Sequence, residues 1–205
     1  MSENYFVSLD GWEEADSFNQ LPPSGQICTI VNAYLARSKN SGNQTLYVEV
    51  DVAQGEFKGY FLGQKKHWNN DSWSSRARLY VPTINQSTGK VNFRLKNFLL
   101  TVEESNPNFK VDTASGKFDI RALKGKFIGV VFGGKEGKLK KDSTERYINA
   151  IADHFITVQK IKDGDFTVPA VIPFEENSSA AKQDDFAGSP VDKKDLPFDP
   201  EDTPF

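Results

Sequence analysis

The 205-residue sequence predicts a mainly β domain of five strands, with one helix between the third and fourth strands. Two observations support this fold class. Short segments alternate apolar and polar residues and are separated by polar turns that contain glycine, a pattern typical of half-buried strands. One segment, residues 93–104, instead repeats its apolar residues with a helical period and lacks both glycine and proline.

Three strands are expected before the helix. Residues 27–37 alternate, and the polar turn at 38–43 leads to a second alternating segment at 45–53, so these two segments are expected to form a hairpin. A glycine-containing turn then leads to a third strand at residues 57–62. The inward face of the first strand is expected to carry alternate side chains: Ile27, Thr29, Val31, Ala33 and Leu35.

The segment at residues 64–90 is predicted as one long polar, aromatic and basic loop, with room for a strand at 78–81. The segments expected after the helix are a short helix or turn at 118–123, a strand at 127–132, a lysine-rich hairpin turn at 133–141 and a last strand at about 144–158. This element order is that of an OB-fold, a five-stranded, partly open barrel. A β-sandwich or another small barrel stays an alternative.

The chain divides into three parts. Residues 25–173 are expected to form the barrel domain. Residues 1–24 form an N-terminal extension that is expected to pack on the barrel, with Trp12 and Phe18 covering its core. Residues 174–205 are acidic and of low complexity, so they are expected to be a disordered tail.

The net charge of −3 conceals an uneven distribution. Residues 58–146 hold 18 bases and 8 acids, whereas residues 1–57 hold 2 bases and 8 acids and residues 174–205 hold 3 bases and 9 acids. A basic middle between acidic ends predicts a surface that binds a polyanion beside an anionic segment.

Composition also argues against several classes of protein. Cys28 is the only cysteine, which excludes intramolecular disulfides and cysteine-rich zinc sites. His67 and His154 lie far apart, and the acids show no clustering of the kind that metal chemistry needs. We therefore expect no enzyme and no cofactor or metal. No apolar run approaches the length of a membrane span, and no leader is recognisable, so the protein is expected in the cytoplasm.

Nucleic-acid binding is better supported, because proteins that bind single strands combine a basic groove with aromatic faces on which bases stack. Residues 58–80 mix both kinds of side chain, and the predicted first and last hairpins add cations where the groove of an OB-fold would need them. The expected nucleic-acid-binding residues are Arg37, Lys39, Tyr47, Lys58, Tyr60, Lys65, Lys66, Trp68, Trp73, Arg76, Arg78, Tyr80, Lys135, Lys138, Lys140, Lys141 and Arg146. Two alternatives stay open: the tryptophans fold back as core, and the hairpin lysines form only a solvated turn.

The last residues of the chain combine acids with a rigid apolar Pro-Phe pair. Such a peptide suits a partner with a small apolar pocket rimmed by Arg or Lys. The expected partner-binding residues are Asp199, Glu201, Asp202, Pro204 and Phe205. A similar piece, residues 195–198, lacks a free carboxylate and is expected to be auxiliary. A tail that only solvates the protein is the plainer interpretation.

With its acidic Pro-Phe end, its barrel-like element order and its Trp-Lys-Arg segment, the chain resembles phage-type single-stranded-DNA-binding proteins. The Leu-Pro-Pro-Ser-Gly sequence at 21–25 and the hairpin at 38–43 add to this resemblance. It implies an OB-fold that coats single-stranded DNA without strong sequence preference during replication and recombination, and a tip that recruits partner proteins. It also implies the host cytoplasm as location if a phage encodes the chain.

The chain departs from bacterial relatives, which have a shorter domain and a Gly/Gln/Pro-rich linker. Their tetrameric assembly therefore does not carry over, and a homodimer stays open. Two other functions stay as alternatives: an interaction protein that docks its tip on a host replication protein, and a nucleic-acid-processing enzyme.

Overall fold

The structure is a computed structural model that describes residues 19–37, 42–68, 72–85, 87–112, 116–140 and 143–174. Its strands are β1 (Ser24–Arg37), β2 (Gln44–Val52), β3 (Arg78–Pro82), β4 (Phe127–Leu139) and β5 (Arg146–Ile156). Its helices are α1 (Tyr60–His67), α2 (Phe93–Ser105) and α3 (Val158–Asp163), with short 3-10 helices η1 (Ser75–Ala77) and η2 (Ile120–Leu123). Most of the N-terminal extension and nearly all of the predicted tail lie outside the described residues.

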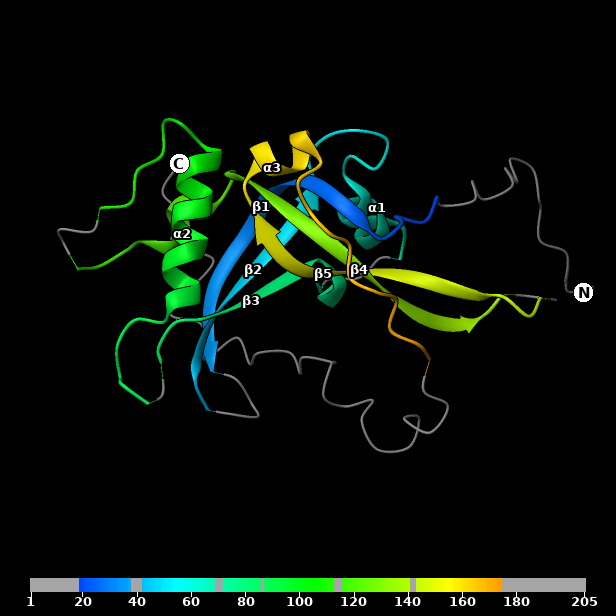
Figure 1. The fold of residues 1–205 in the computed structure, drawn as a ribbon, viewed down its shortest axis with the longest axis horizontal. Coiled ribbons are helices and arrows are strands. Elements are labelled where there is room, and N and C mark those ends of the chain that lie inside the picture. The colour runs from blue at the N-terminus through cyan, green and yellow to red at the C-terminus, as the bar shows by residue number, and fades with distance from the viewer. Residues whose placement is uncertain are drawn as a thin grey trace, which may run out of the picture.

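The five strands form one antiparallel sheet in the order β3-β2-β1-β4-β5 (Figure 1). The predicted mainly β fold is therefore confirmed, as is the helix between the third and fourth strands, which is α2. Asn92 caps the N-terminus of α2, since its side chain accepts a hydrogen bond from the Arg94 N–H, and the helix buries Phe98 and Val102. Phe98 packs edge-to-face on Phe155 of β5.

The predicted third strand at residues 57–62 is wrong. These residues form a turn and the start of α1, and β3 lies instead at the strand allowed for at 78–81 within the segment predicted as a long loop. The cause is Asp51, whose carboxylate accepts hydrogen bonds from the N–H groups of Phe61 (2.9 Å) and Leu62 (3.3 Å) in the first turn of α1. A carboxylate in this position satisfies donors that the helix leaves unpaired.

The predicted inward face of β1 is also wrong in its first half. The register between β1 and β2 shifts between Ile30 and Asn32, which marks a β-bulge. Before the bulge, Cys28 and Ile30 are the buried residues, and after it Ala33 packs against the core. An extra residue in one strand reverses which side chains face inward, so a single alternation cannot describe the whole strand.

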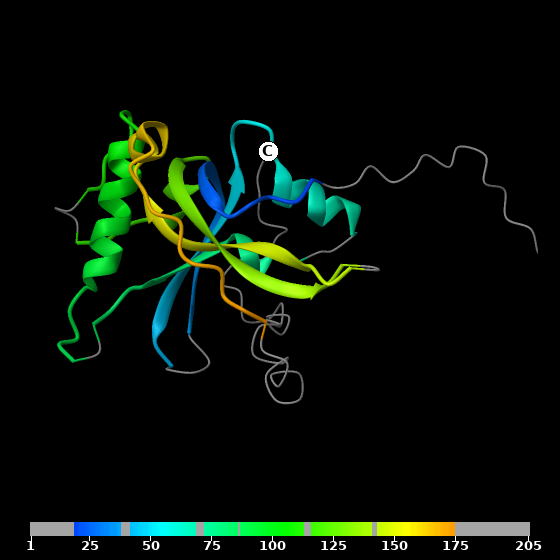
Figure 2. The ribbon, with the colours of Figure 1, turned by 45° about the vertical axis from the view of Figure 1, so that its right-hand side comes forward.

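Strand β4 is longer than predicted. Residues 133–139 were expected as a turn but continue β4 and pair with β5, so the β4–β5 hairpin extends away from the body on the side opposite α2 (Figures 1 and 2). After α3, Ile172 forms an isolated parallel bridge with Lys135, which adds a short segment beside the hairpin.

The core lies between the inner face of the sheet and helices α1 and α2. Phe61 of α1 stacks on Phe132 of β4 with ring centroids 5.7 Å apart, and both side chains are buried. Within the described ranges, no helix is long and apolar enough to span a membrane.

Candidate nucleic-acid interface

Three tyrosines form a row across the outer face of β1, β2 and β3. Tyr47 is the direct cross-strand partner of both Tyr34 and Tyr80. The rings of Tyr34 and Tyr47 are stacked, with centroids 5.3 Å apart and planes 10° apart, and Tyr80 meets Tyr47 edge-on at 5.1 Å. Each cross-strand aromatic pair stabilises the sheet by about 0.2–1 kcal/mol. Tyr80 stands at the sheet edge and is 43% exposed.

Tyr34 was not among the residues selected from the sequence. The predicted alternation, with Ala33 and Leu35 inward, already places Tyr34 on the opposite, outer face, and the structure agrees after the β-bulge. The sequence could not show the register that brings Tyr34 beside Tyr47 and Tyr80.

A polar row lies beside the tyrosines, one pair of residues further along the same strands. Arg78 donates to the Glu49 carboxylate at 2.8 Å, and the Asn32 side chain donates to its other oxygen at 3.2 Å. The Arg78 guanidinium also lies 5.9 Å from the centroid of the Tyr34 ring, while its Nε is buried without a hydrogen-bond partner among the described residues. Burial raises the pKa of Tyr34, and Arg78 opposes that shift. Arg78 thus positions the tyrosine row.

Arg76 and Tyr60 have structural contacts. Arg76 donates to the side-chain oxygens of Gln64 at 2.8 Å and Asn149 at 3.1 Å, and Gln64 donates to the Tyr60 hydroxyl at 3.0 Å. This chain of hydrogen bonds ties α1 and η1 to β5. Tyr60 is only 7% exposed, packed against Phe61, and therefore cannot offer a ring face to a ligand.

The two tryptophans of the predicted basic segment lie in different environments. Trp68 follows α1 and is 73% exposed, with the His67 ring edge-on to it. Trp73 is half-buried against the core and donates its indole N–H to the Ala77 carbonyl at 3.4 Å. Only Trp68 presents an open ring. The neighbouring cations of α1 are Lys65 and Lys66, and Lys58 is exposed just before the helix.

The β4–β5 hairpin carries the second group of cations. Lys135 is exposed and lies opposite Asn149, so the two share the outer face of the hairpin with Arg76. Lys138 is also exposed. Lys140 pairs with Glu145 at 2.8 Å, and Arg146 lies 4.2 Å from the Phe174 ring centroid while donating to the Gly137 carbonyl. Lys135 and Lys138 are therefore the hairpin cations best placed to meet a phosphate chain.

The remaining candidates divide by position. Arg37 is exposed at the end of β1, beside Gln44 of β2. The other predicted residues lie outside the described residues: Lys39, Lys141, Asp199, Glu201, Asp202, Pro204 and Phe205. In the part of the chain that the structure describes, no three His, Cys, Asp or Glu side chains come together as a metal site.

Comparison of the sequence with protein-family models and with curated proteins found no match. The family resemblance therefore stays a prediction, and the function has to be argued from the surface itself.

Proposed function

We propose that this protein binds single-stranded DNA across the outer face of an OB-fold and recruits replication or recombination proteins through its acidic Pro-Phe segment. The observation that carries the proposal is the row of Tyr34, Tyr47 and Tyr80 on three adjacent strands. The expected setting is the host cytoplasm.

The sheet topology supports an OB-fold. The strand order β3-β2-β1-β4-β5 places β3 and β5 at the two edges, and α2 lies between β3 and β4 in the chain. A partly open barrel requires the two edges to approach each other. The Arg76–Asn149 hydrogen bond brings η1, immediately before β3, against β5 and so supplies such an approach.

The aromatic contacts suit a ligand without sequence preference. Stacking of a base on an aromatic side chain is worth about 1–3 kcal/mol and works for every base. Tyr80 has room at the sheet edge, and Trp68 offers a second open ring after α1. Both rings accept unpaired bases, whereas the bases of a duplex are already stacked on each other.

The cations suit the phosphate chain of the same ligand. Arg37 lies at one end of the outer face, and Lys135 and Lys138 lie on the hairpin at the other. Exposed cations of this kind release counterions when they meet phosphates, so binding should weaken as salt rises.

The acidic segment supplies the recruitment half of the proposal. Residues 195–205 contain Asp-Leu-Pro-Phe and Asp-Thr-Pro-Phe, each with an apolar aromatic beside acids. Deleting residues 196–205 is expected to abolish recruitment while DNA binding stays intact or becomes tighter, because an anionic competitor is removed. Unchanged capture of partner proteins by the deleted form would contradict this role.

The direct test is a gel shift with single- and double-stranded DNA and RNA of one length, on the full chain, the tail-deleted chain and Tyr80→Ala. Binding of single-stranded DNA in preference to duplex is expected, and Tyr80→Ala should weaken it. Phe93→Ala is a matched control, since this exposed aromatic lies on α2 and contributes nothing to the tyrosine row. Failure of every oligonucleotide to bind, with tail-dependent capture of other proteins, would instead indicate an interaction protein.

A further inference from the structure

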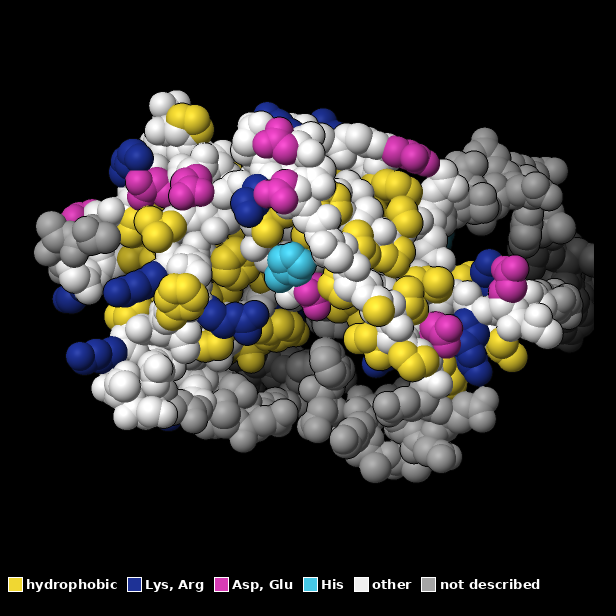
Figure 3. Space-filling model, viewed as in Figure 1, with side chains coloured by type: hydrophobic (Ala, Val, Ile, Leu, Met, Phe, Trp, Pro, Cys, Tyr) yellow, Lys and Arg dark blue, Asp and Glu magenta, His cyan; other side chains and the backbone are white. Residues whose placement is uncertain are grey.

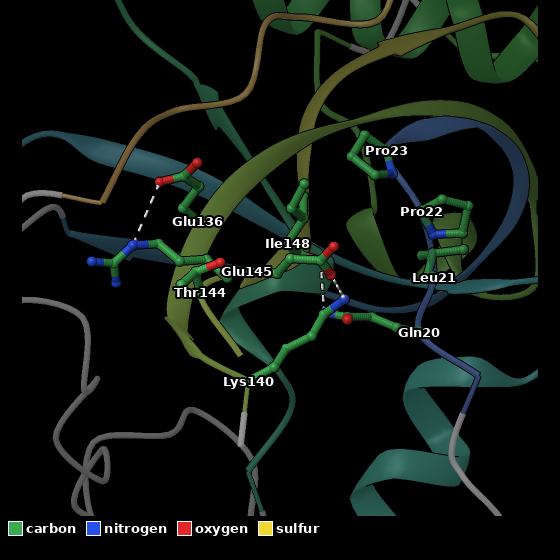
Figure 4. A pocket seen from close by; sticks show the side chains of 10 residues that line it. Gln20, Leu21, Pro22, Pro23, Glu136, Lys140, Thr144, Glu145 and Ile148 are labelled. Carbon is green, nitrogen blue, oxygen red and sulfur yellow. Dashed lines mark hydrogen bonds and ion pairs between the residues drawn. The ribbon is translucent and has the colours of Figure 1, made fainter. Parts of the chain in front are cut away.

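An open pocket separates the N-terminal end of the described chain from the β4–β5 hairpin (Figure 4). One wall consists of residues 20–23, with Leu21, Pro22 and Pro23, and the other includes Ile148 of β5. The Gln20 side chain crosses between them and donates to the Ile148 carbonyl at 2.6 Å. Polar residues of the hairpin form the rest of the lining: Glu136, Lys140, Thr144, Glu145 and Arg146.

The pocket continues into an exposed apolar surface, which we call the inner face of the hairpin. It consists of the exposed residues Leu139, Ile148, Val171 and Phe174 and the partly buried Pro23, and Leu139 is the most exposed at 52%. The Ile148, Val171 and Pro23 side chains converge over Gly134, where an added methyl group would lie 2.9–3.0 Å from each of them. Figure 3 shows apolar side chains gathered over this part of the molecule.

This face is apolar because it continues the inward face of the sheet. Phe132, Gly134 and Ala150 are buried on the same side nearer the body, and the hairpin then extends beyond the core that covers them. Residues 20–23 and 171–174 cover only part of this extension. Exposed apolar side chains grouped in this way mark an interaction site, since their exposure to water is unfavourable.

We propose that residues 1–18 of the same chain bind this inner face and fill the pocket. They join the described chain at Asn19, next to the Gln20 side chain that already contacts Ile148. They hold seven large apolar residues: Met1, Tyr5, Phe6, Val7, Leu9, Trp12 and Phe18. Their short tether gives them a high effective concentration at the pocket.

The sequence next to the pocket favours the same occupant. The C-terminal residues also leave from this face, at Phe174, but their first large apolar residue is Phe186. The N-terminal segment therefore brings apolar side chains directly to the pocket, and the C-terminal one does not. This inference does not depend on nucleic-acid binding.

Trp12 provides a reporter. In the full chain with Trp68→Phe and Trp73→Phe, Trp12 is the only tryptophan. Docking predicts fluorescence at shorter wavelength, and weaker quenching by acrylamide, than in a synthetic peptide of residues 1–18. Adding Ile148→Asp should shift both readings toward those of the peptide, whereas Val91→Asp, at an exposed apolar residue before α2, should not. The readings should not depend on protein concentration.

The proposal would be overturned if the emission of Trp12 equalled that of the peptide and did not respond to Ile148→Asp. It would also be overturned if the readings depended on protein concentration, because the segment would then bind a second copy of the protein. Because Trp73 packs against the core, Trp73→Phe could unfold the chain. The same comparison is then made by fluorine NMR of the chain carrying 5-fluorotryptophan, with Trp12→Phe assigning the resonance. A dye that binds apolar surface should gain fluorescence when residues 1–18 are deleted. The proposal would also be overturned if deletion of residues 175–205 alone produced this gain.

Discussion

The two regions of the proposed DNA surface, the tyrosine row and the β4–β5 hairpin, differ in how firmly their side chains are held in the free protein. In the tyrosine row, each ring is held by a neighbour on the next strand, and Arg78 is already bonded to Glu49. On the hairpin, Lys135 and Lys138 are exposed on a projection from the body. The difference indicates a division of labour, in which the row supplies rigid stacking and the hairpin supplies charge that can adjust to a phosphate chain.

The largest effect is expected from Arg78→Ala, because this substitution removes the contact that supports the tyrosine row. Glu49 would then stay buried without its cation, and losing one partner of a buried pair costs about 3 kcal/mol of folding free energy. The pKa of Tyr34 should also rise further, because Arg78 is the group that lowers it. Chemical denaturation measures the first effect and absorbance titration of tyrosine the second. Arg121→Ala is the control, since its ion pair with Asp119 is exposed; an equal loss there would contradict the role of Arg78.

Tyr47→Ala removes the centre of the row and should weaken binding of oligo-dT by about 1–3 kcal/mol, a factor of roughly 5 to 150. The loss should be similar at every salt concentration, because stacking involves no counterion release. Fluorescence anisotropy with a labelled oligonucleotide measures it. Tyr47→Phe keeps the ring and should bind nearly as the unchanged protein does; a phenylalanine variant as weak as the alanine variant would count against stacking.

The double substitution Lys135→Gln and Lys138→Gln should have the smallest effect on DNA affinity at moderate salt. It should, however, reduce the dependence of that affinity on salt concentration. Each cation that meets a phosphate of a single strand contributes about 0.7 to the slope of log K against log salt, so the slope should fall by about 1.4. Lys110→Gln is the control, because Lys110 pairs with Glu103 at the end of α2. An unchanged slope would mean that the hairpin lysines do not contact the DNA.

Much of the fold could be predicted because local signals agreed with it. Residues 93–104 had a clear helical period and became α2, and the segments predicted as strands at 27–37, 45–53 and 144–158 became β1, β2 and β5. The errors occurred where contacts with residues further along the chain decided the local structure. Asp51 holds the first turn of α1 where a strand was expected, and pairing with β5 extends β4 through Gly133 and Gly134.

The positions of the candidate site residues were harder to predict. Tyr47 and Tyr80 lie on the outer face of the sheet, but Tyr60 is buried and Arg76 is bonded to Gln64 and Asn149. The sequence does not show whether a given tyrosine or arginine lies in the core or on the surface. For Tyr60 and Arg76 the packing of α1 and η1 against β5 decides this.

The sequence by itself determined the mainly β fold class, the helix between the third and fourth strands and the basic middle of the chain, because each depends on residues close together. The tertiary structure decided the tyrosine row and the two faces of the hairpin. These depend on register: the pairing of β1, β2 and β3 brings Tyr34, Tyr47 and Tyr80 side by side, and pairing of β4 with β5 places Lys135 on one face and Ile148 on the other. Register is set by contacts between strands, which no local pattern contains.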